Sequence, residues 1–69
     1  MITPAPYTAT AETVARHLEL THARLVALRR DAEAANMPQS VVMGLHWLCE
    51  DAASTLMDLH NLAARQAAA

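Results

Sequence analysis

The chain has 69 residues, an apolar fraction of 54% and a formal charge of −2, with no lysine and one cysteine. This length allows a single small domain, and the charge argues against a protein whose main task is to neutralise phosphate groups. The lone cysteine, Cys49, excludes an intramolecular disulfide and a cysteine-based zinc site, and it fits a reducing compartment.

Residues able to build a large core are few. Phenylalanine is absent, tryptophan and tyrosine occur once each, and much of the apolar fraction is alanine. At roughly 25 cal/mol per Å² of buried apolar surface, such a core barely offsets the conformational entropy lost on folding. Small chains of this kind gain stability by self-association, so we expect a homodimer.

No stretch of the chain predicts a membrane helix or a signal peptide. The apolar runs fall short of the roughly 18 to 20 residues that span a bilayer, and the first residues lack the charged and apolar regions of a signal peptide. We expect a soluble, cytoplasmic protein with no membrane partner.

Residues 1–9 are predicted to form an extended arm, because Pro4 and Pro6 each disfavour helix at the preceding position. Ile2 and Tyr7 offer apolar anchors that would hold this arm on the helical body or on a partner subunit. A frayed terminus is the alternative interpretation.

A first helix is predicted over residues 10–35. Thr8 or Thr10 offers an N-cap, and Glu12 lies in the first turn, where the helix dipole favours a negative charge. Glu12 and Arg16 form a well-oriented i, i+4 pair. Small and apolar residues recur at alternating steps of three and four, which is the pattern of a heptad seam: Ala11, Val14, Leu18, Thr21, Leu25, Leu28, Ala32 and Ala35.

The break between helices is predicted at residues 35–38. Asn36 tolerates the left-handed conformation of a C-terminal cap, and Pro38 suits the first turn of a new helix, because its missing N–H would lack a partner there anyway. A connection this short places the two helices antiparallel.

A second helix is predicted over residues 38–66, followed by a tail over residues 67–69. One row of its residues has heptad spacing: Val41, Leu45, Leu48, Ala52, Thr55, Leu59 and Leu62. A second row runs beside the first: Val42, Cys49, Ala53, Leu56 and Ala63. Together they make a stripe wider than one partner helix can cover. Gly44 interrupts this helix, and either a close approach by a neighbouring segment or a neutral accident explains it.

These elements predict an all-α fold, an antiparallel helical hairpin that dimerises into a four-helix bundle. Two paired hairpins would cover both stripes, and steps of three and four suit helix crossing angles near 20°. The residues expected in the core or at the dimer contact are Leu18, Leu25, Leu28, Val41, Leu45, Leu48, Leu56, Leu59 and Leu62.

Three apolar residues interrupt the polar face of the second helix. Met43, Trp47 and Met57 lie there beside Glu50, and Trp47 points away from the leucine seam. A tryptophan beside flexible methionines is typical of a surface that anchors a protein partner. We therefore take these four residues as candidate partner-binding residues. The structural alternative is that the apolar residues of the arm fold over Trp47.

Metal binding and catalysis find little support in the sequence. His46 and Glu50, at i and i+4, could hold a metal ion from one helix face, but the third ligand would have to come from His60 or a second copy. Histidines beside a core seam are the ordinary interpretation. No nucleophile lies beside a plausible base, and no glycine-rich loop is present to hold phosphate. We expect no cofactor, no metal and no enzymatic activity.

Nucleic-acid binding is the alternative function. Arg16, Arg24, Arg29 and Arg30 give the first helix a basic character, and other small four-helix dimers bind RNA on one face. These arginines are spread around the helix and alternate with acidic residues: Glu12, Glu19, Asp31 and Glu33. A solvated, salt-paired face is the simpler interpretation.

A tryptophan-leucine pair, acidic residues and a pair of alanines follow one another in GLHWLCEDAA at residues 44–53, and the pattern continues through Leu56, Asp58 and Leu59 to Arg65-Gln66-Ala67. This run resembles the second helix of the quorum-sensing anti-activators carried by Mu-like Pseudomonas phages, whereas the first helix is similar only in pattern. The resemblance implies a dimeric hairpin that binds a host protein and blocks it, such as an acyl-homoserine-lactone-responsive transcriptional activator or the ATPase that drives pilus assembly.

Taken together, these observations predict a small non-enzymatic protein-interaction module, an inhibitor or adaptor that binds a host regulator. A dimeric hairpin that binds nucleic acid is the alternative.

Overall fold

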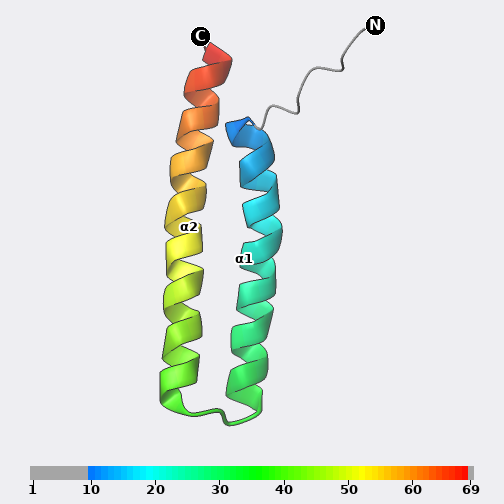
Figure 1. Cartoon of the computed structure of the whole chain (residues 1–69), viewed down its shortest axis with the longest axis vertical. Helices are drawn as coiled ribbons and strands as arrows, with labels where there is room; N and C mark the ends of the chain where they lie inside the picture. The colour runs from blue at the N-terminus through cyan, green and yellow to red at the C-terminus, as the bar shows by residue number, and fades with distance from the viewer. Residues whose placement is uncertain (1–9, 69) are drawn as a thin grey trace, which may run out of the picture.

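The structure, a computed structural model, describes residues 10–68. Within this range the chain forms two α-helices, α1 (Ala11–Ala34) and α2 (Gln39–Ala68), and no strand. The helices run side by side in opposite directions (Figure 1). The prediction of an all-α helical hairpin is therefore confirmed. The arm expected over residues 1–9, with its anchors Ile2 and Tyr7, lies outside the described residues.

Thr10 begins α1 as its N-cap. Its backbone is extended, and its Oγ1 accepts a hydrogen bond from the Thr13 N–H at 3.2 Å. In return the Thr10 N–H donates to Thr13 Oγ1 at 2.9 Å, which completes a capping box. Glu12 lies in the first turn and pairs with Arg16 one turn further on. The cap satisfies N–H groups that the start of a helix otherwise leaves without partners.

Asn36 turns the chain out of α1. Its φ of 54° lies in the left-handed region, as predicted from its residue type. The Asn36 N–H donates to the Glu33 carbonyl at 3.1 Å, and the Met37 N–H donates to the Ala32 carbonyl at 3.0 Å. These two bonds form a Schellman motif, which ends a helix while pairing its last carbonyls.

Pro38 stands directly before α2, and its carbonyl accepts a hydrogen bond from the Val41 N–H at 2.9 Å. With 30 residues, α2 is about 45 Å long, whereas α1, with 24 residues, is about 36 Å long. The helix includes residues 67 and 68, which we expected in a tail. The C-terminal end of α2 therefore extends past the start of α1 (Figure 1).

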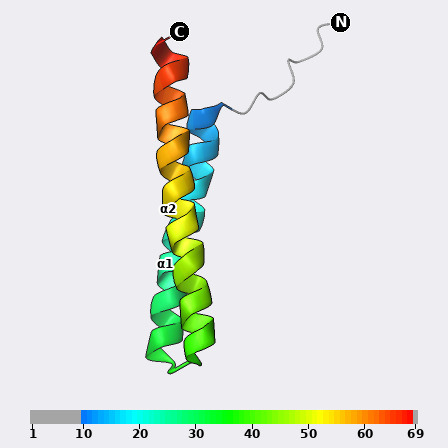
Figure 2. The same ribbon diagram turned by 90° about the vertical axis from the view of Figure 1, so that its left-hand side faces the viewer.

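Small residues bring the two helices together. The buried side chains of residues 10–68 are Ala11, Ala15, Ala32, Cys49 and Ala52. Half-buried leucines lie between them: Leu18, Leu25, Leu45, Leu56 and Leu59. Figure 2 shows the two helices crossing at a shallow angle. Because alanine has little bulk the helix axes approach closely, but for the same reason each contact buries little apolar area.

The contact between the helices uses alternate members of the first row predicted for α2 and all members of the second row except Ala53. It uses Leu45, Ala52 and Leu59 from the first row, and Val42, Cys49, Leu56 and Ala63 from the second. The remaining members of the first row stay exposed in the single hairpin: Val41, Leu48, Thr55 and Leu62. Of these, Val41, Leu48 and Leu62 were expected in the core or at the dimer contact, and a role at the dimer contact stays a prediction. The physical reason is size, because a seam through Cys49 and Ala52 allows a closer approach than one through Leu48.

The predicted row of α1 divides in the same way. Ala11, Leu18, Leu25 and Ala32 face α2, whereas Val14, Thr21, Leu28 and Ala35 are exposed. Ala15 and the half-buried His22 and Arg29 complete the contact instead.

Gly44 lies on the exposed surface of α2. A Cβ at this position would meet nothing within 4 Å, so the close approach that would explain this glycine is not made within residues 10–68. Its cost to the helix, about 1 kcal/mol relative to alanine, is thus not offset by a contact inside the hairpin.

Replacing Gly44 by alanine should raise the free energy of unfolding by up to about 1 kcal/mol, because alanine favours the helix and restricts the unfolded chain. Urea denaturation followed by circular dichroism measures the change. The exposed Ala53→Gly substitution is the reverse control and should cost a similar amount. A loss of stability in Gly44→Ala would mean that another chain packs against this position.

Candidate protein-interaction site

An exposed apolar surface follows one side of the hairpin along both helices. Its members recur every seven residues, and we call this surface the apolar side: Val14, Thr21 and Leu28 of α1, its C-cap residue Ala35, and Val41, Leu48, Thr55 and Leu62 of α2. Leu28 and Leu48 are each 51% exposed. All eight residues occupy the same place in the heptad, just before a seam position. In an antiparallel helix pair, equivalent flanking positions of the two helices meet on one side.

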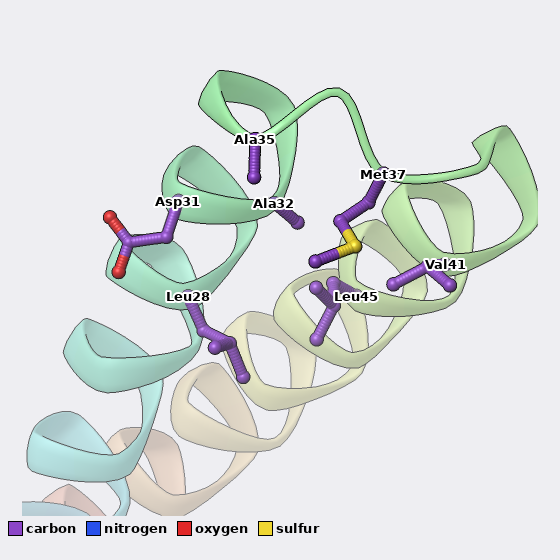
Figure 3. A pocket seen from close by; sticks show the side chains of 7 residues that line it. All are labelled: Leu28, Asp31, Ala32, Ala35, Met37, Val41 and Leu45. Atoms are coloured by element: carbon purple, nitrogen blue, oxygen red, sulfur yellow. The ribbon is translucent and has the colours of Figure 1, made fainter.

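A hollow at the connection shows that the two rows share one side of the hairpin. It has a volume of about 380 Å³, and its lining is apolar apart from one carboxylate: Leu28, Asp31, Ala32, Ala35, Met37, Val41 and Leu45. In Figure 3 the side chains of Leu28, Met37 and Val41 border the same space, while the carboxylate of Asp31 points away from Met37. Residues of both helices and of the connection therefore form one continuous apolar surface.

Two contacts across the hairpin set the axial register of the helices. Glu19 Oε1 lies 3.1 Å from His60 Nε2, and Arg29 Nη1 lies 3.4 Å from His46 Nδ1. Because a guanidinium only donates, His46 Nδ1 is the acceptor in the second contact. Counted from these contacts, the members of the apolar side pair level by level from the connection outward: Ala35 with Val41, Leu28 with Leu48, Thr21 with Thr55, and Val14 with Leu62.

The opposite side of the hairpin is polar. The flanking positions there are Glu12, Glu19, Val26 and Glu33 in α1, and His46, Ala53, His60 and Ala67 in α2. The contacts of Glu19 with His60 and of Arg29 with His46 lie on this side. The hairpin therefore offers large aliphatic side chains to a partner on one side and charged groups on the other.

A second exposed surface runs along the outer face of α2. We call it the Trp47 stripe, and it consists of Met43, Trp47, Glu50 and Met57, all exposed. The structure thus places the four candidate partner-binding residues on one face. Trp47 is 59% exposed, and at about 100° per residue it points almost directly away from α1. Its indole meets the ring of His46 edge-on, with 5.3 Å between the ring centroids.

The third ligand that a metal site at His46 and Glu50 would need does not lie beside them in the hairpin. His60 contacts Glu19 and lies 14 residues beyond His46, about 21 Å along α2. Within residues 10–68, no three His, Cys, Asp or Glu side chains come close enough together to hold a metal ion.

The arginines of α1 lie on different faces. Arg16 pairs with the exposed Glu12, and Arg29 lies half-buried with 3.4 Å between its Nε and Oε1 of Glu33. Arg24 and Arg30, both exposed, lie on different faces of α1. A nucleic-acid backbone is bound by basic groups gathered along one surface, so this arrangement gives the nucleic-acid alternative no support.

Comparisons of the chain with protein-family models, with curated proteins and with solved structures gave no match. The resemblance of the second helix to the phage anti-activators therefore remains a prediction. Neither α1 nor α2 has the length and apolar character needed to cross a membrane.

The sequence placed the residues of the apolar side in the two heptad rows but did not separate residues of the helix contact from residues of the dimer contact. Two signals in the sequence separate the roles. The line through Cys49 and Ala52 carries the smaller residues, and Glu12, Glu19 and Glu33 mark the polar side at steps of seven. The hollow beside Met37 had no sequence signal, because it depends on how the connection folds back over both helices.

The fluorescence of the chain should report a solvated indole, because Trp47 is its only tryptophan. We expect emission close to that of free tryptophan, full quenching by acrylamide, and no change when residues 2–9 are deleted. Blue-shifted emission that the deletion abolishes would instead show that the arm covers Trp47.

Proposed function

We propose that this chain is a non-enzymatic protein-interaction module that acts as a dimer. Two hairpins pair through their apolar sides into a four-helix bundle, and the Trp47 stripe of each hairpin binds a protein partner. The observation that carries the proposal is the separation of two exposed apolar surfaces, one along the side of the hairpin and one on the outer face of α2.

The case for the dimer rests on what the single hairpin leaves in water. Its buried side chains are four alanines and one cysteine, while five larger aliphatic residues of the apolar side are exposed: Val14, Leu28, Val41, Leu48 and Leu62. Burial of an aliphatic side chain contributes roughly 1.5 to 3 kcal/mol when it is complete. A second hairpin would bury these side chains on both copies at once, which a chain of this size needs for stability.

The case for a partner at the Trp47 stripe rests on its residue types and direction. Tryptophan is among the residues that contribute most to binding at protein interfaces, and methionine adapts its shape to the partner. Trp47 points away from α1 and lies on a different face of α2 from the apolar side. Dimerisation through the apolar side therefore leaves it accessible. Glu50, exposed in the same stripe, adds a charge that selects among partners.

The kind of partner follows from the resemblance of the second helix to the phage anti-activators. On that basis we propose that the chain is an inhibitor or adaptor of a host regulator, with a quorum-sensing transcriptional activator or a pilus ATPase as the targets to test first. Binding of a rigid helical stripe would block such a protein by occupying the surface that it needs for its own assembly or for its own ligand.

Leu48→Glu should prevent dimerisation, because it places a charge in the middle of the apolar side. Sedimentation equilibrium at micromolar concentration, with circular dichroism for helix content, measures the effect. The matched control is Leu20→Glu, since Leu20 is 54% exposed but lies on the outer face of α1. Leu48→Glu should give a monomer of reduced helix content, and Leu20→Glu an unchanged dimer. A wild-type chain that is a folded monomer at this concentration would contradict the dimer.

Trp47→Ala should leave the dimer and its helix content intact but weaken binding to a purified target by about tenfold to a hundredfold, which is the range for an interface anchor. Isothermal calorimetry with the ligand-binding domain of the activator, or with the pilus ATPase, measures the affinity. Leu20→Ala, an equally exposed residue on the other helix, is the control. Equal affinity for both variants would exclude the Trp47 stripe as the binding surface.

A further inference from the structure

We infer that the two hairpins of the proposed dimer pair with their connections at the same end of the bundle, so that α1 of each copy lies against α2 of the other. This inference rests on the proposed dimer and adds its geometry. It follows from charged residues that border the apolar side and from the order of leucines and threonines along it.

Two arrangements bring the apolar sides of two copies face to face around a two-fold axis. An axis parallel to the helices keeps the levels of the two copies aligned and puts α1 against α2 of the second copy. An axis across the helices reverses one copy, so that α1 meets α1, α2 meets α2, and the connections lie at opposite ends. The two arrangements bury the same residues, so other features must decide between them.

The outer edges of the apolar side carry complementary charges. Six of the eight residues three positions after its members are charged or histidine: His17, Arg24 and Asp31 on α1, and Asp51, Asp58 and Arg65 on α2. By the register of the hairpin, Arg24 lies close to the level of Asp51 and His17 close to the level of Asp58, each within about two residue rises, or ~3 Å. In the same-end arrangement these residues of different copies face each other on both edges of the contact. Because the dimer is symmetric, the contact of Arg24 with Asp51 and the contact of His17 with Asp58 each occur twice.

The opposite-end arrangement brings like charges together. Its axis passes midway along the apolar side, where Arg24 of one copy would meet Arg24 of the other, and Asp51 would meet Asp51. Its complementary contact is His17 with Asp31. Like charges opposite one another across an interface are unfavourable and select against this pairing.

The order of the layers along the apolar side also favours the same-end arrangement. In the same-end arrangement, Leu28 and Leu48 of both copies form one layer, and Thr21 and Thr55 of both copies form the next. The Thr21 hydroxyl donates to the His17 carbonyl at 3.2 Å, which leaves its oxygen free to accept from another threonine. The reversed arrangement instead sets these hydroxyls against leucines. A single polar layer inside an apolar contact also fixes the register of the helices.

The hollow beside the connection fits this geometry. Ala35 and Val41 are the smallest pair of the apolar side, and in the same-end arrangement the two hollows face each other. Met37, half exposed and bent over the hollow in Figure 3, can fill this space from both copies, since methionine adapts to irregular gaps.

The arrangement determines where partners bind. With α1 against α2 of the second copy, the two α2 helices occupy diagonal corners of the bundle. The two Trp47 stripes then face in opposite directions at the same height, near the connections. Each dimer would bind two partner molecules on opposite faces, with no contact between them.

The distance between spin labels tests the arrangement directly. A nitroxide is attached to Gln39→Cys in a Cys49→Ala background, and electron double resonance measures the separation within the dimer. The same-end arrangement predicts about 30 Å or less, whereas the opposite-end arrangement predicts more than about 40 Å, from the rise per residue and the spacing of packed helices. The short distance supports the inference, and the long one overturns it while leaving the dimer intact. A signal without any defined separation overturns the dimer itself.

Charge reversal gives an independent readout. Arg24→Glu and Asp51→Arg should each raise the dissociation constant of the dimer on the order of tenfold at low salt, and the two substitutions in one chain should restore it. Arg30→Glu, which changes the net charge equally but lies away from the apolar side, should have little effect. If Arg24→Glu acts no more strongly than Arg30→Glu, or the double variant fails to recover, the inference is wrong.

Discussion

The hairpin depends on a contact built from very small side chains. Alanines and a cysteine let α1 and α2 approach closely, but they bury so little apolar area that the pair gains only modest stability from it. Half-buried leucines lie between these small residues, while other large aliphatic residues, such as Leu28 and Leu48, lie exposed along the flank of the contact.

The two flanks of the contact carry different kinds of side chain, so the hairpin has two chemically different sides. One flank carries glutamates and histidines that pair with each other or with Arg29, and the other carries leucines, valines and threonines. Of the two flanks, the second therefore offers apolar contact. The Trp47 stripe lies on the outer face of α2, so in the proposed dimer one short chain would combine a self-association contact with a separate surface for another protein.

The exposed rows of apolar side chains are the features of this hairpin that bear on function. A helical pair of this length presents rigid rows of side chains, which suits recognition of another protein along an extended face. The resemblance of the second helix to the phage anti-activators agrees with such a role and suggests the class of target. The residues proposed to bind it come from the exposure and direction of Trp47 and its neighbours, not from that resemblance.

The sequence by itself determined the elements of the fold. Heptad steps, the threonine cap, Asn36 and Pro38 were enough to predict two antiparallel helices, because these signals are local and act on the backbone directly. It also grouped Met43, Trp47, Glu50 and Met57 on one face, since helical spacing alone fixes that. Only the tertiary structure decided which apolar row faces α1 and which stays exposed. That choice depends on how closely two particular helices can approach, and neighbouring rows of similar hydrophobicity differ in bulk at a few positions such as Leu48 and Cys49.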